Sequence, residues 1–381
     1  MRTGLAESAL YSRLLPDLSV RNSLALAALG ACDSLWMPDH LVGLFPQSLW
    51  TPERSAGAKL IPLADAYYDA WTLLGYVAAK NRWRRLRLGT GVTDAGRRHP
   101  AVTAQAAASL HQLTRGRAIL GIGPGERENN EPFGVDWSKP VGRFEEAVAT
   151  IRALWDSDGT PISRDSDYYP LRDAVFAVPR HRGTRPPIWI AAHGPRMLRA
   201  AGRYGDGWLP AYAQVPDEYA ESLTRIKDSA ATAGRDPERF TAAKWFFVVT
   251  AGSDEVVEEV LDTPLLRAFA LCVPATHWAR HGVEHPLGPT FSGAQDVLPQ
   301  LLDEETALAL GKRAPMSMLR EQILSGTPDE VVDKVAQWRD AGVRYAVFAN
   351  LTPFHPKLLA GMGAGRALVS VLRRVRKLGT D

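Results

Sequence analysis

Cysteine is nearly absent from this chain of 381 residues. The two that occur, Cys32 and Cys272, stand far apart and outside any C-x-x-C spacing. A disulfide framework needs several cysteines at short, fixed spacing, so we expect none to organise this fold. Sparse cysteine is typical of proteins in the reducing cytosol, and we therefore expect a cytoplasmic protein.

Long hydrophobic runs are lacking as well. The longest, from Leu24 to Ala31, is far too short to cross a bilayer, so we expect no stable membrane insertion. The N-terminal segment carries Arg2, Glu7 and Arg13, and therefore has no continuous apolar core of the kind that an export signal requires.

The chain also has no excess of charge of one sign. Its 45 Lys and Arg residues stand against 42 Asp and Glu residues, which gives a net charge of +3. Nucleic-acid binding depends on a one-sided basic field, so no nucleic-acid partner is expected. The G-x-S-x-G elbow of covalent-nucleophile hydrolases is missing, and neither cysteine has a catalytic signature.

Short buried strands alternate with amphipathic helices along most of the chain. The predicted strands are Gly4–Ala9, Ser34–Pro38, Leu86–Val92, Ala118–Gly123, Pro187–Ala191, Gly205–Leu209, Ala243–Val249 and Val343–Phe348. Eight strands with intervening helices match the repeating unit of a closed parallel barrel. We therefore predict a single-domain α/β fold, a (β/α)8 TIM barrel over residues 1–381. The alternative is an open, doubly wound sheet, which rarely needs eight strands over this length.

Two segments interrupt the alternation. Residues 160–180 predict a β-rich insertion, with tyrosines between turn-forming residues. Residues 273–326 are rich in Pro, Gly, His and Trp and show no clean period. A loop of that length is uncommon in a compact domain unless it is functional, so we expect it to pack as a lid over the active site.

Polar and glycine-rich sequences follow four of the predicted strands, where barrel enzymes carry their catalytic groups. Asp39 and His40 come directly after the second strand, and they can act either as titratable groups at the barrel mouth or as an ordinary helix cap. After the fourth strand, Gly125 precedes Glu126, and Asn129 follows. This loop delivers a carboxylate and an amide to the mouth, which suits a flat ring with polar edges.

Two further loops complete the set. Gly91-Val92-Thr93-Asp94 follows the third strand, where glycine marks either a close approach of the backbone to a ligand or a simple tight turn. Ala191-Ala192-His193-Gly194 precedes a helix, and it can serve as an anion site or as an ordinary helix start.

One motif suggests a metal. His281, Glu284 and His285 fit the H-x-x-E-H pattern of inverted zinc peptidases. That site needs both histidines on one face of a continuous helix, and here Gly282 and Pro286 work against such a helix. We predict no metal site.

The four loops together resemble the bacterial luciferase-like superfamily, and within it the branch that uses the deazaflavin coenzyme F420. The resemblance covers essentially the whole chain, and it is carried by Trp36-Met37-Pro38-Asp39-His40, Gly89-Thr90-Gly91-Val92, Gly123-Pro124-Gly125-Glu126 and Ala191-Ala192-His193-Gly194-Pro195. It implies a homodimeric F420-dependent oxidoreductase. It also implies a non-prolyl cis peptide at Gly91-Val92.

The resemblance assigns roles to the residues of these loops. His40 and Glu126 become the two candidate catalytic acids, without a decision between them. Coenzyme binding is assigned to Asp39, Gly91, Val92, Thr93, Asp94, Gly125, Asn129, Ala191, Ala192, His193 and Gly194. The loop from Ala192 to Gly194 is expected to receive the phosphate end of the coenzyme.

The substrate implied is a carbonyl on a large apolar molecule, such as phthiodiolone dimycocerosate. Family members that oxidise a sugar phosphate have a tryptophan at the position of Leu44, and their basic cluster is missing at Ala211–Gln214. Two alternatives remain open: an FMN-dependent monooxygenase of the same superfamily, and a barrel that binds a ligand without catalysis.

Overall fold

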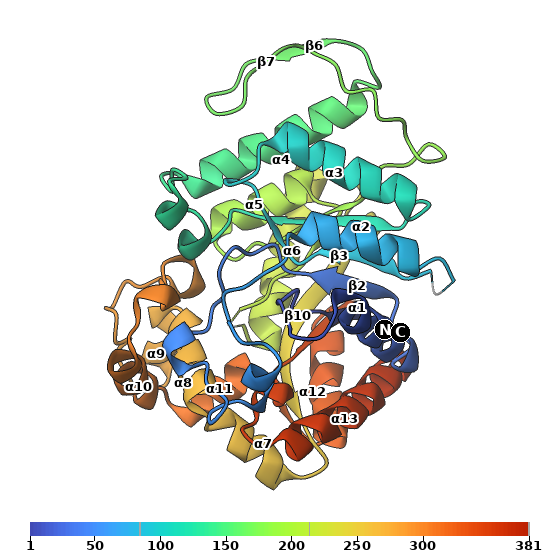
Figure 1. Ribbon diagram of the computed structural model, residues 1–381. Helices are drawn as coiled ribbons and strands as arrows, with labels where there is room; N and C mark the ends of the chain where they lie inside the picture. Colours follow the sequence, from blue (N-terminus) through green and yellow to red (C-terminus); the bar gives the residue numbers. More distant parts are fainter. Residues whose placement is uncertain (84, 213, 380–381) are drawn as a thin grey trace.

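The computed structural model describes residues 1–83, 85–212 and 214–379. Eight parallel strands close into a barrel, with helices packed around it (Figure 1). The barrel strands are, in spatial order, β1 (Arg2–Ala6), β2 (Ser34–Met37), β3 (Arg87–Thr90), β5 (Ala118–Gly123), β8 (Ile188–Ile190), β9 (Gly207–Trp208), β10 (Thr241–Thr250) and β12 (Tyr345–Asn350), which pairs back onto β1. The predicted (β/α)8 fold is confirmed.

Large aromatic side chains fill the inside of the barrel. The ring centroids of Trp36 and Trp189 are 5.2 Å apart, and those of Trp189 and Tyr345 are 5.0 Å apart. Glycines on neighbouring strands make room for them, because a Cβ on Gly89 would lie 2.5 Å from the indole of Trp36. Small residues opposite large ones are how a narrow barrel is filled at native packing density.

Helices surround the barrel, and most of them bury one face in the protein core. Their bounds are α1 (Pro16–Leu29), α2 (Ala70–Lys80), α3 (Pro100–Leu113), α4 (Pro140–Asp156), α5 (Pro195–Tyr204), α6 (Pro216–Thr232), α7 (Asp254–Leu261), α8 (Pro264–Phe269), α9 (Ala275–Arg280), α10 (Glu304–Lys312), α11 (Met316–Gln322), α12 (Pro328–Asp340) and α13 (Leu358–Lys377). Many begin with a proline, which suits the first helical turn because the N–H group missing there has no helical partner. The N-terminus lies beside the end of α13, and the Met1 amino group donates to the carbonyl of Leu378 at 2.6 Å (Figure 1).

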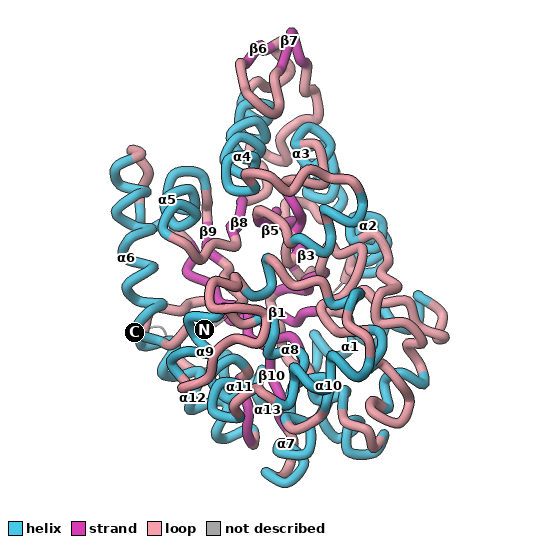
Figure 2. The backbone as a smooth tube through the Cα atoms, turned by 90° about the vertical axis from the view of Figure 1, so that its left-hand side faces the viewer, coloured by secondary structure: helices cyan, strands magenta, loops and turns pink. Residues whose placement is uncertain are grey.

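Two segments lie outside the simple alternation. Within residues 160–180, β6 (Ile162–Arg164) and β7 (Leu171–Ala174) form an antiparallel pair at one extremity of the molecule, beyond α4 (Figures 1 and 2). Residues 273–326 contain α9, α10, α11 and β11 (Leu324–Gly326), which pairs with the carboxyl end of β10. The sequence did not predict α9, α10 and α11, because helices of six to nine residues are too short to show a helical hydrophobic period.

Within the described part of the chain, no helix is both long and apolar enough to pass through a membrane.

Candidate active site

A cavity of about 1120 Å³ opens at the carboxyl ends of the barrel strands. Twelve of the thirteen predicted site residues line it, namely Asp39, His40, Gly91, Val92, Thr93, Asp94, Gly125, Glu126, Asn129, Ala191, His193 and Gly194. The exception is Ala192, which is buried behind the wall, where its carbonyl accepts a hydrogen bond from the indole of Trp208 at 2.8 Å. The four loops predicted from sequence therefore meet around one cavity.

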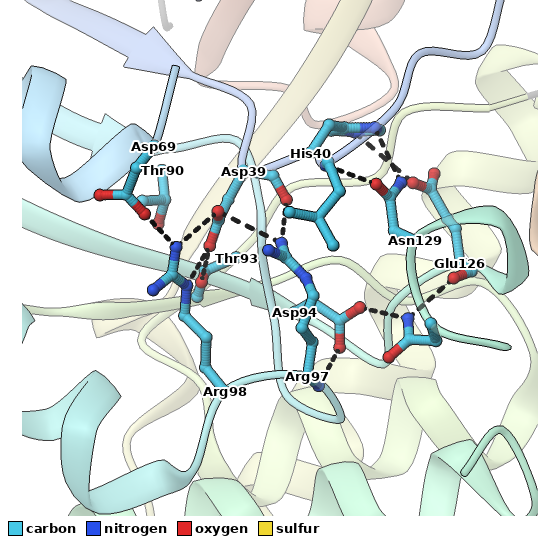
Figure 3. Close-up of polar contacts among 12 residues, drawn as sticks. Asp39, His40, Asp69, Thr90, Thr93, Asp94, Arg97, Arg98, Glu126 and Asn129 are labelled. Carbon is cyan, nitrogen blue, oxygen red and sulfur yellow. Dashed lines mark hydrogen bonds and ion pairs between the residues drawn. The ribbon is translucent and has the colours of Figure 1, made fainter. Parts of the chain in front are cut away.

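Asp39 is buried and surrounded by donors (Figure 3). Its carboxylate accepts hydrogen bonds from the Thr93 hydroxyl at 2.5 Å and from Arg98 at 2.9 and 3.1 Å, and Arg97 lies 3.2 Å away. Arg97 also donates to the backbone carbonyl of Asp39, and Arg98 reaches Asp69 on the outside. The polar atoms of Asp39 and Thr93 are thus engaged with protein groups, and their contribution to the cavity is to fix its wall.

The charge balance at Asp39 follows from these contacts. Burial alone would raise the pKa of this carboxyl, but the hydrogen bonds from Arg98 and the charges of Arg97 and Arg98 outweigh burial and lower it. Asp39 therefore stays ionised. The two arginines belong to the site although sequence reasoning did not single them out, and the available signal was a pair of arginines in a turn that follows a strand at the mouth.

Asn129 holds His40 in place (Figure 3). The side-chain oxygen of Asn129 accepts from the backbone N–H groups of Leu41 at 2.6 Å and Val42 at 3.0 Å. This fixes the orientation of the amide, so its NH2 group faces the Nδ1 atom of His40 at 3.1 Å and the carboxyl of Glu128 at 3.1 Å. Asn129 therefore acts as a clamp on the His40 loop.

The surroundings of the His40 ring determine its tautomer. In the neutral ring, Nδ1 accepts from Asn129, which places the proton on Nε2. Nε2 faces Glu126 at 3.5 Å, and the ring stacks on Tyr67 with centroids 5.7 Å apart. When the ring is protonated, Nδ1 can donate instead to the carbonyl of Val42, 3.2 Å away. In both protonation states, therefore, each ring nitrogen of His40 faces a polar partner.

Glu126 and Glu128 form a pair of acids beside His40. Burial raises the pKa of Glu126, while the charge of His40 and a hydrogen bond from Glu128 act in the opposite direction. Glu128 is fully buried, and it was missed from sequence because nothing in its three-residue turn shows which side chain points inward. His40, Glu126 and Glu128 offer atoms within 4.8 Å of one another, the one such group that could hold a metal ion among the described residues.

Part of the cavity wall is made of backbone. The peptide between Gly91 and Val92 is cis, in agreement with the resemblance, and a Cβ on Gly91 would lie 2.5 Å from the Trp245 ring. Gly125 has a φ of +92°, and a Cβ there would lie 2.3 Å from the Asp94 carboxylate. Asp94 itself accepts from the backbone of Gly96 at 2.6 Å, so its carboxylate shapes the loop.

Replacing Gly125 with alanine should therefore destabilise the fold. The positive φ costs about 1–2 kcal/mol, and the clash with Asp94 adds about 1–3 kcal/mol. Gly134→Ala is the matched control, because Gly134 has a φ of +76° but open space around it. Urea unfolding of both variants separates the two costs. Equal losses of unfolding free energy in the two variants would show that the clash with Asp94 does not contribute to the destabilisation.

The loop before α5 offers a place for an anion. Gly194 precedes the helix, and the first amide bonded within the helix is that of Leu198, which donates to Gly194. The amides of the first turn therefore point out of the helix end, where the helix dipole favours negative charge. The side chain of Arg196, in the first turn of α5, is paired with Glu145 at 2.5 Å.

Apolar and aromatic side chains line the rest of the cavity. Phe45 stacks on Phe269 with centroids 5.1 Å apart, and Phe354 meets both Phe45 and Trp50 edge-on at 4.7 and 5.3 Å. Leu44, Tyr212, Phe247 and Phe291 continue this surface, and residues 274–277, 289–292 and 294–295 of the late insertion line the cavity as well.

The H-x-x-E-H residues do not form a metal site. His281 bonds to Ser317 at 2.9 Å and to Glu321 at 3.2 Å. His285 is buried, faces the carbonyl of Leu271 and stacks on Phe291. The two histidines therefore have separate partners, and α9 ends at Arg280, before the motif begins.

The barrel and its mouth define a luciferase-like α/β barrel. The chain belongs to the luciferase-like monooxygenase family, whose pattern matches residues 32–345. It is 52% identical over 377 residues to the phthiodiolone/phenolphthiodiolone dimycocerosates ketoreductase of Mycobacterium sp. (strain JLS), with 99% of each chain covered. This relative places the chain among the oxidoreductases of the family.

Two solved structures share the fold. An F420-dependent secondary alcohol dehydrogenase in complex with an F420-acetone adduct superimposes with a TM-score of 0.72 and 19% identity, covering 97% of this chain and 99% of the other. The coenzyme F420 dependent tetrahydromethanopterin reductase from Methanopyrus kandleri gives a TM-score of 0.71 and 20% identity, covering 99% and 98%.

Proposed function

We propose that this protein is an F420-dependent ketoreductase that reduces a carbonyl on a large apolar substrate. The observation that carries the proposal is the placement of His40 and Glu126 at the mouth of the barrel, 3.5 Å apart, in the same cavity as the Gly91–Val92 peptide. Similarity over the full length to a ketoreductase supports the reaction type.

The cavity fits a deazaflavin. Gly91 and Gly125 bring backbone without a side chain to its surface, so a flat ring can approach closely at these two positions. The start of α5 at Gly194 suits the negatively charged end of the coenzyme. When bound, F420 supplies a hydride from its central carbon, and the chemistry of hydride transfer belongs to the coenzyme.

The protein's own task is to provide a proton. A ketone whose carbon receives a hydride must also gain a proton on its oxygen, and the protonated His40 ring is placed to donate one from Nε2, which leaves the other ring proton on Nδ1. Glu126 faces the same nitrogen, and its carboxylate stabilises the protonated ring. The Val42 carbonyl accepts from Nδ1 in that state, so the ring keeps its orientation before and after donation.

The proposal of an apolar substrate rests on the aromatic residues that line the rest of the cavity. Phe45, Phe269 and Phe354 provide an apolar surface next to the polar trio, and a sugar or an organic acid would leave its hydroxyl groups unpaired there. A ketone on a long hydrocarbon chain is the class that matches, and phthiodiolone dimycocerosate is one such molecule.

The coenzyme proposal is tested by offering reduced F420 and reduced FMN to the purified protein, with and without oxygen. We expect a long-chain ketone to reoxidise reduced F420 in an anaerobic, protein-dependent reaction. Reoxidation of reduced FMN that requires both oxygen and the substrate would instead establish the monooxygenase. If neither coenzyme turns over but a ligand binds, the barrel is a binding protein.

A further inference from the structure

Glu128 is a buried acid that the proposed reaction does not use directly. Its side chain is fully buried at the back of the His40 and Glu126 pair. One carboxyl oxygen accepts from the Asn129 amide at 3.1 Å. Among the described residues, no N–H or O–H group donates to the other oxygen. A buried oxygen that lacks a donor is costly for a carboxylate, and much less so for an oxygen that carries a proton.

The nearest partner for that proton is Glu126. The two carboxyl groups lie beside each other, with one atom of each within 4.8 Å, and a hydrogen bond between them requires that one of them is protonated. Glu126 faces the cavity with 22% of its side chain exposed, whereas Glu128 is fully buried. The neutral form therefore belongs on Glu128, where a charge would be least solvated.

We propose that Glu128 is a positioning residue: it stays a neutral carboxylic acid and donates its proton in a hydrogen bond to Glu126, which holds Glu126 as a carboxylate facing His40. Its proton does not leave. The proton transferred to the substrate comes from His40, and the donor bond from Glu128 keeps the negative charge on Glu126 that favours the protonated ring. This inference rests on the proposed function in one respect, namely that His40 is the proton donor.

Other charged and titratable groups around the pair agree with this assignment. Burial raises the pKa of Glu128 well above its ordinary value, and the charge of Glu126 raises it further. The groups that act on one or both of the two acids, or that are themselves affected by them, are His40, Asp94, Arg97, Tyr67, Tyr212 and Cys272. Burial raises the pKa of both tyrosines and of the Cys272 thiol, so these three groups are neutral. Of the six groups named, His40 and Arg97 are the two that can carry positive charge.

Infrared spectroscopy of the coenzyme-free protein tests the protonation state without any activity. The wild type should show a carboxylic-acid C=O band that persists at neutral pH and disappears in Glu128→Gln. Glu131→Gln is the matched control, because Glu131 is exposed and paired with Arg127, and it should leave the band in place. A wild-type spectrum without such a band at neutral pH would overturn the proposal, and so would a band that survives in Glu128→Gln. A metal held by this trio would require both carboxylates ionised, and it would therefore also remove the band.

The pH profile of kcat then tests the role. On the acidic side of this profile, kcat falls as Glu126 becomes protonated; we call this fall the acidic limb. Glu128→Met removes the donor to Glu126, so the pKa of Glu126 rises and the acidic limb should move to higher pH by about one to two units. Glu128→Gln keeps a donor and should keep the limb at the wild-type pH, whatever happens to its height. If Glu128 is ionised in the wild type, Glu128→Gln removes a negative charge and shifts the limb to lower pH, which contradicts the proposal. An unmoved limb in a folded Glu128→Met variant contradicts it equally.

Discussion

Replacing His40 with alanine should lower kcat by roughly 10²–10⁴-fold, the usual contribution of a general acid, while the dissociation constant of F420 changes little. The reason is that different groups donate the proton and bind the coenzyme. The proton at Nε2 of His40 has no substitute at that position, whereas the surface proposed for the coenzyme is backbone at Gly91, Val92 and Gly125.

Fluorescence titration measures the coenzyme affinity of this variant, because Trp245 lines the cavity. Single-turnover kinetics then report the reduction step itself. His181→Ala serves as the control, since His181 lies outside the cavity and contacts Gln112 and Thr184. A parallel loss of coenzyme affinity and turnover would mean that His40 is a binding residue and would remove it from the role of proton donor.

Replacing Asp39 with asparagine should strongly destabilise the fold. The change leaves Arg97 and Arg98 without their buried counter-charge, and breaking a buried pair typically costs 3–5 kcal/mol. We expect about 3 kcal/mol, the lower end of that range, because Arg98 keeps its contact with Asp69. The coenzyme should also bind more weakly, since the loop from Thr93 to Arg98 loses its anchor.

Urea unfolding measures this loss, and Asp69→Asn is the matched control. Asp69 caps α2 by accepting from the amide of Thr72, and asparagine caps equally well, so that variant loses only an exposed ion pair worth about 0–1 kcal/mol. The pKa of Asp39 is lowered in the fold, so its contribution is present above the ordinary aspartate value of 3.8 and is lost as the pH falls below it. Similar losses for the two variants would contradict the account of Asp39.

The fold and the position of the site could be predicted from sequence because both depend on repeated, local signals. Each barrel strand is a short buried run, and the carboxyl ends of parallel strands meet at one end of a barrel. Asp39, Gly91, Glu126 and His193 each follow a different strand, so their convergence follows from topology alone.

The contacts within the site could not be predicted in the same way. Asp39 lines the cavity, but its contacts with Arg97 and Arg98 were not predicted, because the approach of the two arginines depends on the turn that Asp94 fixes through Gly96. Glu128 differs from its exposed neighbour Glu131 only in the direction in which a short turn points its side chain. Such directions are set by tertiary packing, and single-sequence patterns carry little information about them.

The central claim is that this barrel holds reduced F420 and passes its hydride to a ketone carbon. The most direct test uses F420 that carries deuterium at the hydride-donating carbon, with a long-chain ketone and the protein under anaerobic conditions. We predict deuterium on the carbinol carbon of the product, with the hydroxyl proton drawn from solvent. An alcohol without label on that carbon, or an oxygenated product that forms only when air is admitted, would contradict the account.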